Sequence, residues 1–560
     1  MKKCFLSLFL ALTVLVSSSG CSIFELPDFF EISFAGGDAD SDELFWGEAI
    51  IAEGYSASNL EVTLSEEDLA RFYDQIDLCR RLFENEDPRE EDALRSALYE
   101  LFNMRKQAKL QSDVAYLLYY YDLADEEAKE TYQYTYLTYD KINSAYWVLQ
   151  SELNNSAGVH SDVYKAYRAD AHSSGVINRT ADAGAYKLEM NALETEYYDL
   201  MGSVPDAELC EVFVKYLDAA NHFAVESYAT DFYEYSARQT SYRDYGAEER
   251  ERFREYVKGY IVPLYRIYKA RFKSFEDHIS SRDYAKTTKL LENDFRTLDE
   301  NYLLSYFKAL PEDMGSEMIG AFVKDRMLIS NRPKAYGNPF VMELGTVSIC
   351  YFPASRLDLM TVSHELGHYY ANTQGIPVTT SRDLMEVHSH ANEALFCAYL
   401  DRLLQNDVSK DFLLYSIYDK LYQIILQTIR DHFYEIVIKS ATTVAYTPEL
   451  LEDVMLELIE EYDVANISTN IRKHLTTSWQ RISPHSICDS LSYAVSDVIA
   501  LQLYQISQSD FDRATACYQR LSTDIDKESS FLGTLRNAGL SSPFDESTYI
   551  ALMEIADIDH

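Results

Sequence analysis

The sequence predicts a mainly α-helical fold built from more than one lobe, with a small β element in its C-terminal half. The chain has 560 residues, whereas single hydrophobic cores stop growing at roughly 250–300 residues. Apolar residues recur three and four positions apart along most of the chain, which is the periodicity of amphipathic helices. Only 12 prolines are present, and because proline breaks or kinks helices, long uninterrupted helices are expected.

The first residues predict a targeting segment rather than part of the fold. Lys2 and Lys3 are followed by an uncharged apolar run over residues 5–16. This run is too short to cross a bilayer, because a spanning helix needs about 20 residues. The small residues 18–20 then precede Cys21. A basic start, a short apolar run and small residues are typical of a cleaved secretory signal.

Because a cysteine follows at once, this segment resembles a bacterial lipoprotein signal, although Ser18 stands where an aliphatic residue is usual. The resemblance implies that residues 1–20 are removed and that Cys21 becomes a lipid-bearing N-terminus, anchored outside the cytoplasm on a bacterial membrane. The acidic stretch 21–45 is then expected to be a tether. The alternative is an ordinary secretory signal with an incidental cysteine.

The charge balance argues against nucleic acid as a partner. The chain has 50 basic and 91 acidic residues, for a formal net charge of −41. A surface this acidic repels phosphate backbones, so nucleic acid is not expected to bind. The eight cysteines are scattered without short paired spacings, which argues against a zinc ribbon or a disulfide-dense scaffold. Nothing in the composition indicates an oligomeric state.

Residues 46–325 are expected to form an N-terminal helical region. Ser65 followed by three acidic residues is a typical helix start. Gly- and Ser-containing stretches at residues 154–158 and 173–175 mark loops. The periodicity predicts helices over residues 91–122, 125–152, 184–201, 206–237, 247–274 and 284–308.

A turn-rich break at residues 331–339 lies near the start of a C-terminal region, residues 326–560. Residues 340–352 predict two short strands around a turn at Gly345, because apolar residues from Val347 to Tyr351 alternate with other types. The helical pattern then returns and predicts helices over residues 356–372, 383–405, 409–439, 448–462 and 488–507.

The first of these C-terminal helices carries a metal-binding pattern, His364-Glu365-Leu366-Gly367-His368. Two histidines four residues apart share one helix face, so both imidazoles can reach one metal ion. The glutamate after the first histidine can take a proton from a water molecule that the metal polarises. This pattern also occurs by chance in long proteins, so its context has to support it.

The next predicted helix supplies that context, since a catalytic zinc needs a third protein ligand and an open position for water. Asp383 is a plausible helix start, and Glu386, His390 and Glu393 follow on one face. Burying unpaired charge is costly, and a metal site would compensate for it. For His390 two other interpretations compete with direct zinc binding: a core histidine bonded to a carboxylate, or a residue that orients a ligand.

The two segments together resemble the thimet oligopeptidase and oligoendopeptidase family, mainly helical zinc peptidases with a Glu-Val-His-Ser-x-Ala-Asn-Glu type of second helix. The resemblance is good over residues 330–400 and weaker over 475–505. It implies one zinc ion held by His364, His368 and Glu386, with Glu393 as a carboxylate behind the ligands. Glu386 follows His368 by 18 residues, fewer than is usual in the family, and Glu393, at 25, fits that interval better. We assign Glu386 because a loop between helices can shorten without moving either helix.

The same resemblance implies roles for residues near the C-terminus. His485 and Tyr493 match family positions that contact the substrate and stabilise the oxyanion. The interval between them is shorter than usual, and Cys488-Asp489-Ser490 replaces a Tyr-rich stretch. His388 faces another side of its helix and is expected to be structural or to lie behind the ligands.

The expected function is therefore zinc-dependent endopeptidase activity on oligopeptides, with Glu365 as the general base. By resemblance, the helical lobes enclose a deep channel that admits oligopeptides, and the strand at residues 347–352 could hold them by strand addition. Two alternatives remain. One is a zinc-containing surface binding protein with little or no turnover; the other is a carboxypeptidase of related helical architecture.

Overall fold

The computed structural model describes residues 62–85, 87–156, 160–171, 180–278, 301–323, 326–344, 347–376, 381–405, 407–465, 472, 475–480, 488–525 and 530–557. Cys21, the expected tether, Gly345 and His485 lie outside these ranges. Within them the fold is mainly α-helical with one small sheet, as the sequence predicts.

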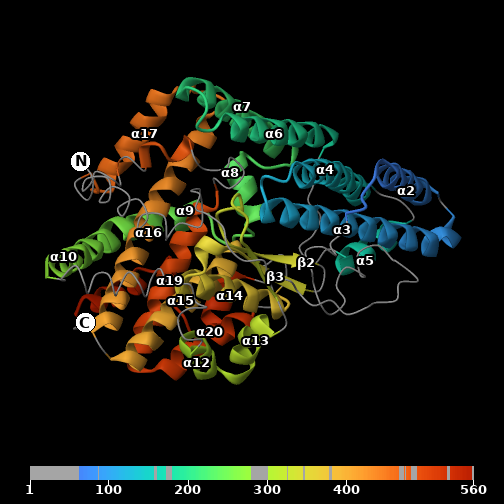
Figure 1. Cartoon of the computed structure of the whole chain (residues 1–560). Coiled ribbons are helices and arrows are strands. Elements are labelled where there is room, and N and C mark those ends of the chain that lie inside the picture. Colours follow the sequence, from blue (N-terminus) through green and yellow to red (C-terminus); the bar gives the residue numbers. More distant parts are fainter. Residues whose placement is uncertain are drawn as a thin grey trace.

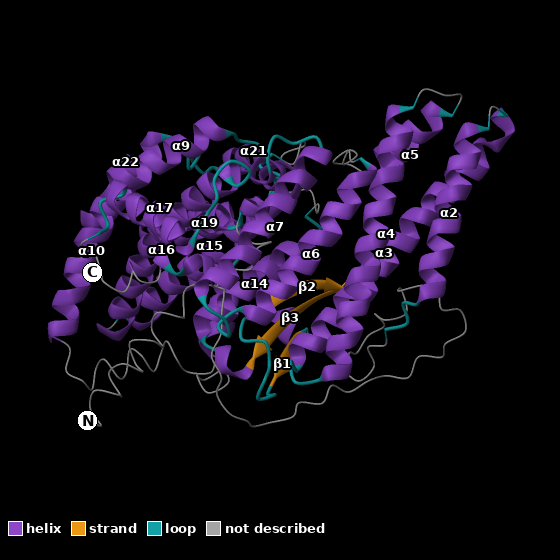
Figure 2. Ribbon diagram, turned by 90° about the horizontal axis from the view of Figure 1, so that it is seen from above, coloured by secondary structure: helices purple, strands orange, loops and turns teal. Residues whose placement is uncertain are grey.

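The first helices form an arm that extends from one side of the molecule (Figures 1 and 2). They are α2 (Glu66–Glu84), α3 (Glu91–Tyr121), α4 (Glu126–Asn155) and α5 (Ser161–Ala171), with a short 3₁₀ turn η3 (Pro88–Glu90) before α3. Helix α2 begins where predicted, because Ser65 and Asp68 form a capping box. The backbone N–H of Ser65 donates to the Asp68 carboxylate at 3.0 Å, which satisfies a donor that the helix leaves free.

The next group of helices leads to the sheet. It comprises α6 (Ala181–Leu200), α7 (Asp206–Glu226), α8 (Phe232–Tyr235), α9 (Ala247–Tyr256), α10 (Val262–His278), α12 (Asn301–Ala309) and α13 (Glu312–Val323), with π-helical turns η4 (Ser236–Thr240) and η5 (Val257–Ile261). The single helix predicted over residues 206–237 is wrong, because α7 ends at Glu226. Tyr228 has φ 60°, a left-handed conformation that a helix cannot continue through. Asp231 then caps α8 by accepting from the Glu234 N–H.

The sheet has three strands, β1 (Met327–Ser330), β2 (Phe340–Leu344) and β3 (Val347–Pro353), in the order β1-β3-β2. Strands β2 and β3 confirm the predicted pair and run antiparallel, while β1, which the sequence analysis missed, pairs with β3 in parallel. Cys350 and Tyr351 of β3 pair with a strand on both sides, whereas residues 347–349 pair with β2 alone. A substrate strand could therefore add beside residues 347–349 or along the outer edge of β1 or β2, and the expectation for residues 347–352 stays a prediction.

The two faces of the sheet are buried in different clusters. Ile349 and Tyr351 of β3 pack with Val114 and other apolar residues of α3. Cys350 and Phe352, which alternate with them, belong to the large core that also contains α14. Figure 2 shows the strands between α14 on one side and α3 with α4 on the other. The sheet therefore joins the arm to the body next to the helix with the metal-binding pattern.

The remaining helices form the body. They are α14 (Leu359–Thr373), α15 (Arg382–Leu404), α16 (Asp407–Ser440), α17 (Pro448–Glu461), α19 (Ser490–Ser509), α20 (Phe511–Thr523), α21 (Phe531–Ala538) and α22 (Glu546–Met553), with 3₁₀ turns η6 (Ala354–Arg356), η7 (Ser478–Gln480) and η9 (Glu554–Asp557). Helix α15 packs against α14, α16 and α19. Figure 1 shows these helices close together in the body, and most residues of α15 before its last turn are buried.

The hydrophobic clusters divide the chain near the end of the arm. One cluster takes residues from Leu64 to Tyr167, whereas the largest runs from Ala183 to Ile555 and spans the expected boundary between residues 325 and 326. None of the helices in the described ranges is long and apolar enough to cross a membrane. The six cysteines that the structure describes are free and buried.

Candidate metal centre

Helices α14 and α15 touch at Gly367. A Cβ on this residue would lie 2.4 Å from the carbonyl oxygen of His388 and 2.7 Å from the Cα of Ser389, so only glycine permits the approach. Asn392 of α15 fixes the same contact, because its side-chain amide donates to the carbonyl oxygen of Ser363 at 2.6 Å. The two polar helix faces predicted from the sequence therefore face each other.

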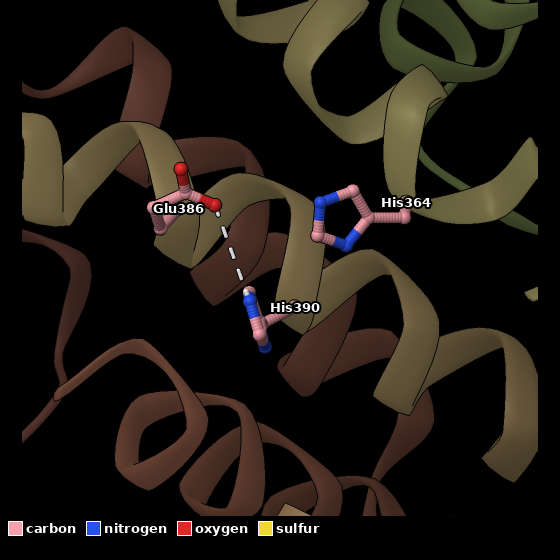
Figure 3. A group of neighbouring side chains, drawn as sticks. All are labelled: His364, Glu386 and His390. Atoms are coloured by element: carbon pink, nitrogen blue, oxygen red, sulfur yellow. Dashed lines mark ion pairs between the residues drawn. The ribbon is translucent and has the colours of Figure 1, made fainter. Parts of the chain in front are cut away.

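Four side chains meet between these helices. Nitrogen or oxygen atoms of His364, Glu386 and His390 all lie within 4.8 Å of one another, and Figure 3 shows the three side chains converging from the two helices. His368 approaches from α14, with its Nε2 3.5 Å from Oε2 of Glu386 and its ring centroid 4.9 Å from that of His364. Of the three expected ligands, His364 and Glu386 thus belong to this group together with His390, whereas His368 lies beside it and contacts Glu386.

Two of the imidazoles donate a hydrogen bond from Nδ1 to a carboxylate. Nδ1 of His364 donates to Oε1 of Glu393 at 2.5 Å, and Nδ1 of His390 donates to Oδ1 of Asp497 at 2.6 Å. A carboxylate in this position fixes the ring orientation and the tautomer of a metal-binding histidine. In both rings the other nitrogen, Nε2, is left for the space between the helices.

A buried lysine joins the two carboxylates. Lys420 of α16 donates to Oε2 of Glu393 at 2.8 Å and to Oδ1 of Asp497 at 3.0 Å. The ammonium group offsets the cost of burying two carboxylates. The sequence analysis missed Lys420 and Asp497. The signal that could have indicated Asp497 is a lone charge within the apolar run of α19, which has to find a partner when buried.

The charges of the site act strongly on one another. Burial alone would raise the pKa of Glu386, but His368 and Arg382 outweigh it and lower this pKa to about 2. Burial would likewise lower the pKa of His368, yet the neighbouring Glu386 raises it. Burial also opposes ionisation of Glu393, but Lys420 and His364 keep its pKa well below the ordinary value. At neutral pH the site therefore presents ionised carboxylates to any cation.

Glu365 is a buried carboxylate that follows the first histidine of α14. It is 4 % exposed, and Oε2 has no hydrogen-bond partner among the described residues. Burial raises the pKa of its carboxyl group, against the effect of His364 and His368. Its charge also acts on Cys350 of β3, whose thiol pKa burial already raises. Glu365 thus interacts electrostatically with both histidines and with β3, and its Oε2, which has no hydrogen-bond partner among the described residues, can accept a proton.

The start of α15 is anchored by a carboxylate whose role the sequence did not reveal. Asp383, predicted only as a helix start, is fully buried. Its Oδ2 accepts from the hydroxyl of Tyr245 at 2.6 Å, and its Oδ1 accepts from Ser492 at 2.6 Å and from Arg243 at 3.3 Å. Because these partners come from two distant parts of the chain, they fix the position of Glu386 one turn later.

The other predicted site residues lie at different distances from this group. The ring of Tyr493 on α19 is 5.8 Å from that of His390, centroid to centroid, and its hydroxyl is bonded to Arg382. His388 points away, and its Nε2 is 3.3 Å from the hydroxyl of Ser522 on α20. Burial lowers the pKa of His388 to about 3, so it is a neutral, structural histidine. His485 lies outside the described residues.

The donor set fits a zinc ion. Zinc in proteins is bound by imidazole nitrogen and carboxylate oxygen, and both are present on facing helices. Nε2 of His390 is buried and has no hydrogen-bond partner among the described residues, although buried nitrogens are normally paired. The side chains of His364 and His368 keep 21 % and 16 % of their surface exposed, which leaves solvent access on the α14 side.

Comparisons with known proteins support the fold. No protein-family model and no curated protein sequence matches the chain. Among solved structures, a PZ peptidase A bound to an inhibitor has a TM-score of 0.64 at 16 % identity over 89 % of this chain and 98 % of its own. A protein from Bacillus anthracis strain Ames assigned as an oligoendopeptidase F has a TM-score of 0.62 at 14 % identity, covering 89 % and 96 %. An oligoendopeptidase F from Enterococcus faecium has a TM-score of 0.58 at 12 % identity, covering 88 % and 96 %.

These similarities extend over nearly the whole length of each protein, so they concern the complete architecture rather than one motif. At such low identity they establish a shared fold. With its helical arm, its small sheet and its paired helices α14 and α15, this chain has the fold of the oligoendopeptidase F structures.

Proposed function

We propose that this chain is a zinc-dependent endopeptidase that hydrolyses oligopeptides. The observation that carries the proposal is the position of Glu365, buried beside His364 and His368 on α14, which Gly367 allows to approach α15 closely at His388 and Ser389. A protein that only binds zinc has no use for a buried carboxylate with a free oxygen at this place, and such a group is costly to keep. A general base, in contrast, requires one.

His364, His368 and Glu386 would hold the ion, which when bound polarises water and the carbonyl oxygen of a peptide. Glu365 would take the proton of the attacking water and pass it to the leaving amine. Glu393 would keep Nε2 of His364 directed at the ion through its bond to Nδ1. Tyr493, beside His390, is the candidate to donate a hydrogen bond to the carbonyl oxygen as negative charge develops there.

The substrate backbone would pair with an open strand edge, either residues 347–349 of β3, which β1 does not cover, or the outer edge of β2. In β2, residues 340–342 are partly buried and Glu343 is exposed. By resemblance to the oligoendopeptidase family, the surrounding helices would form a deep channel that admits oligopeptides and excludes folded proteins.

We expect the purified chain to cleave a mixed peptide library at internal bonds, to lose this activity on treatment with a chelator, and to regain it with zinc. Mass spectrometry of the products provides the measurement. Loss of single C-terminal residues would show a carboxypeptidase instead. Zinc binding without any products would show a surface binding protein.

We also propose that Cys21 anchors the protein to the outside of a bacterial membrane. A lone acyl chain binds membranes only weakly, whereas the cysteine of a lipoprotein carries several. The full-length protein should therefore fractionate with membranes, and Cys21→Ser should move it to the soluble fraction. Equal amounts of both forms in the soluble fraction would show that residues 1–20 are only a secretory signal. Equal retention in the membrane would show that something other than the lipid holds the protein.

A further inference from the structure

His390 differs from an ordinary core histidine. It is 7 % exposed, and one ring nitrogen, Nδ1, is engaged by Asp497 at 2.6 Å. The other, Nε2, has no hydrogen-bond partner among the described residues. Nε2 lies 4.0 Å from Oε2 of Glu386, and one ligand atom each of His364, Glu386 and His390 lie within 4.8 Å of one another.

The bond to Asp497 determines what Nε2 can do. With the proton on Nδ1, Nε2 of the neutral ring carries a lone pair and can only accept. The atom that it approaches, Oε2 of Glu386 at 4.0 Å, is also electron-rich and cannot donate. Two such atoms repel each other in a buried site unless a proton on Nε2 or a metal ion lies between them. Leaving Nε2 unpaired would cost about 1–3 kcal/mol, and a metal ion removes both penalties.

His390 and His364 are oriented by the same kind of hydrogen bond. Each imidazole has a carboxylate on Nδ1, and Lys420 donates to both carboxylates. One network of α15, α16 and α19 therefore orients two rings whose centroids are 5.2 Å apart. A histidine that served only to fill the core would not require a fixed tautomer with its lone pair directed toward the facing helix.

We propose that His390 is an additional metal ligand of this chain, beside His364, His368 and Glu386, and that Asp497 positions it. The inference rests on the proposed function only in requiring a metal at this site. Three imidazoles and one carboxylate would then hold the ion. Water can still enter, because zinc with a catalytic role accepts a fifth ligand.

The test is X-ray absorption at the zinc edge on the purified full-length chain loaded with one equivalent of zinc. Three imidazoles in the coordination sphere are expected, and two would overturn the inference. Because the unmodified chain is measured, the result does not depend on a variant that folds. A chain that binds no zinc would contradict both this inference and the proposed function. A zinc site with two imidazoles would contradict this inference alone.

Three variants extend the test. His390→Gln should reduce the count to two imidazoles. Asp497→Asn should keep three but weaken zinc binding by about 10–100-fold, as is usual for a carboxylate behind a ligand. His388→Gln is the matched control: it removes another buried histidine of α15, one that contacts Ser522, and should leave three imidazoles. An unchanged zinc affinity in Asp497→Asn would contradict the role of Asp497, and a lower imidazole count in His388→Gln would contradict the assignment of His390.

Discussion

Glu365→Gln should bind zinc like the unmodified chain and lose nearly all peptide hydrolysis. The amide keeps the shape of the side chain but cannot take a proton from water. A positioned general base typically contributes about 10²–10⁴-fold to the rate, so kcat should fall by at least about 100-fold. The stability should not decrease, because the carboxylate is buried with a free oxygen and the amide carries no charge. Zinc content, the denaturation midpoint and kcat on one identified peptide are the three measurements.

Tyr493→Phe provides a useful comparison. It keeps the ring beside His390 and removes only the hydroxyl. Loss of one oxyanion donor typically costs about 10²–10³-fold in kcat, with zinc content unchanged. Hydrolysis by Glu365→Gln at the rate of the unmodified chain, with zinc bound, would show that another group is the base.

Gly367→Ala should destabilise the protein and weaken zinc binding at the same time. The added methyl group would lie 2.4 Å from a backbone oxygen of α15, and backbone cannot move aside as a flexible side chain can. Overpacking of this kind costs about 1–3 kcal/mol, occasionally more, which exceeds the gain of about 1 kcal/mol from replacing a helical glycine by alanine. Any separation of α14 from α15 also moves the two histidines of α14 away from Glu386.

Gly259→Ala is the matched control. Gly259 is also in a helical segment, η5, but a Cβ there would meet nothing within 4 Å. This variant should be neutral or slightly more stable. Denaturant unfolding and zinc titration of both variants give the comparison. Equal stability and equal zinc affinity of the two would contradict the close helix contact as the basis of the site.

The local parts of the fold could be predicted from the sequence. The start of α2 followed from its cap, that of α17 from helix periodicity, and the strand pair β2–β3 from the alternation of residue types, because all three depend on residues close together in the chain. Strand β1 could not be predicted, since three apolar residues and a serine, Met327–Ser330, become a strand only when β3 lies beside them. The break after α7 was also missed, because no glycine or proline marks the left-handed backbone at Tyr228.

Prediction of the candidate site from the sequence is limited in the same way. The spacing on α14 and α15 indicated which residues could meet one metal ion, since a helix fixes the relation of positions four apart. Which of them meet depends on partners 27 to 138 residues away in the sequence. Asp497 and Lys420 orient His390, and Tyr245 holds the start of α15. No local pattern encodes these contacts.

The reactivity of the buried free cysteines can be used to measure local unfolding of this protein. A thiol reacts with alkylating reagents as the thiolate, and burial raises the pKa of Cys79 and of Cys397 to about 12. Alkylation of either residue thus requires local opening. Cys79 is the cysteine of the arm cluster, whereas Cys397 belongs to the large core near the metal centre. Their labelling rates, followed by mass spectrometry without any engineered probe, would compare how often the arm and the body open.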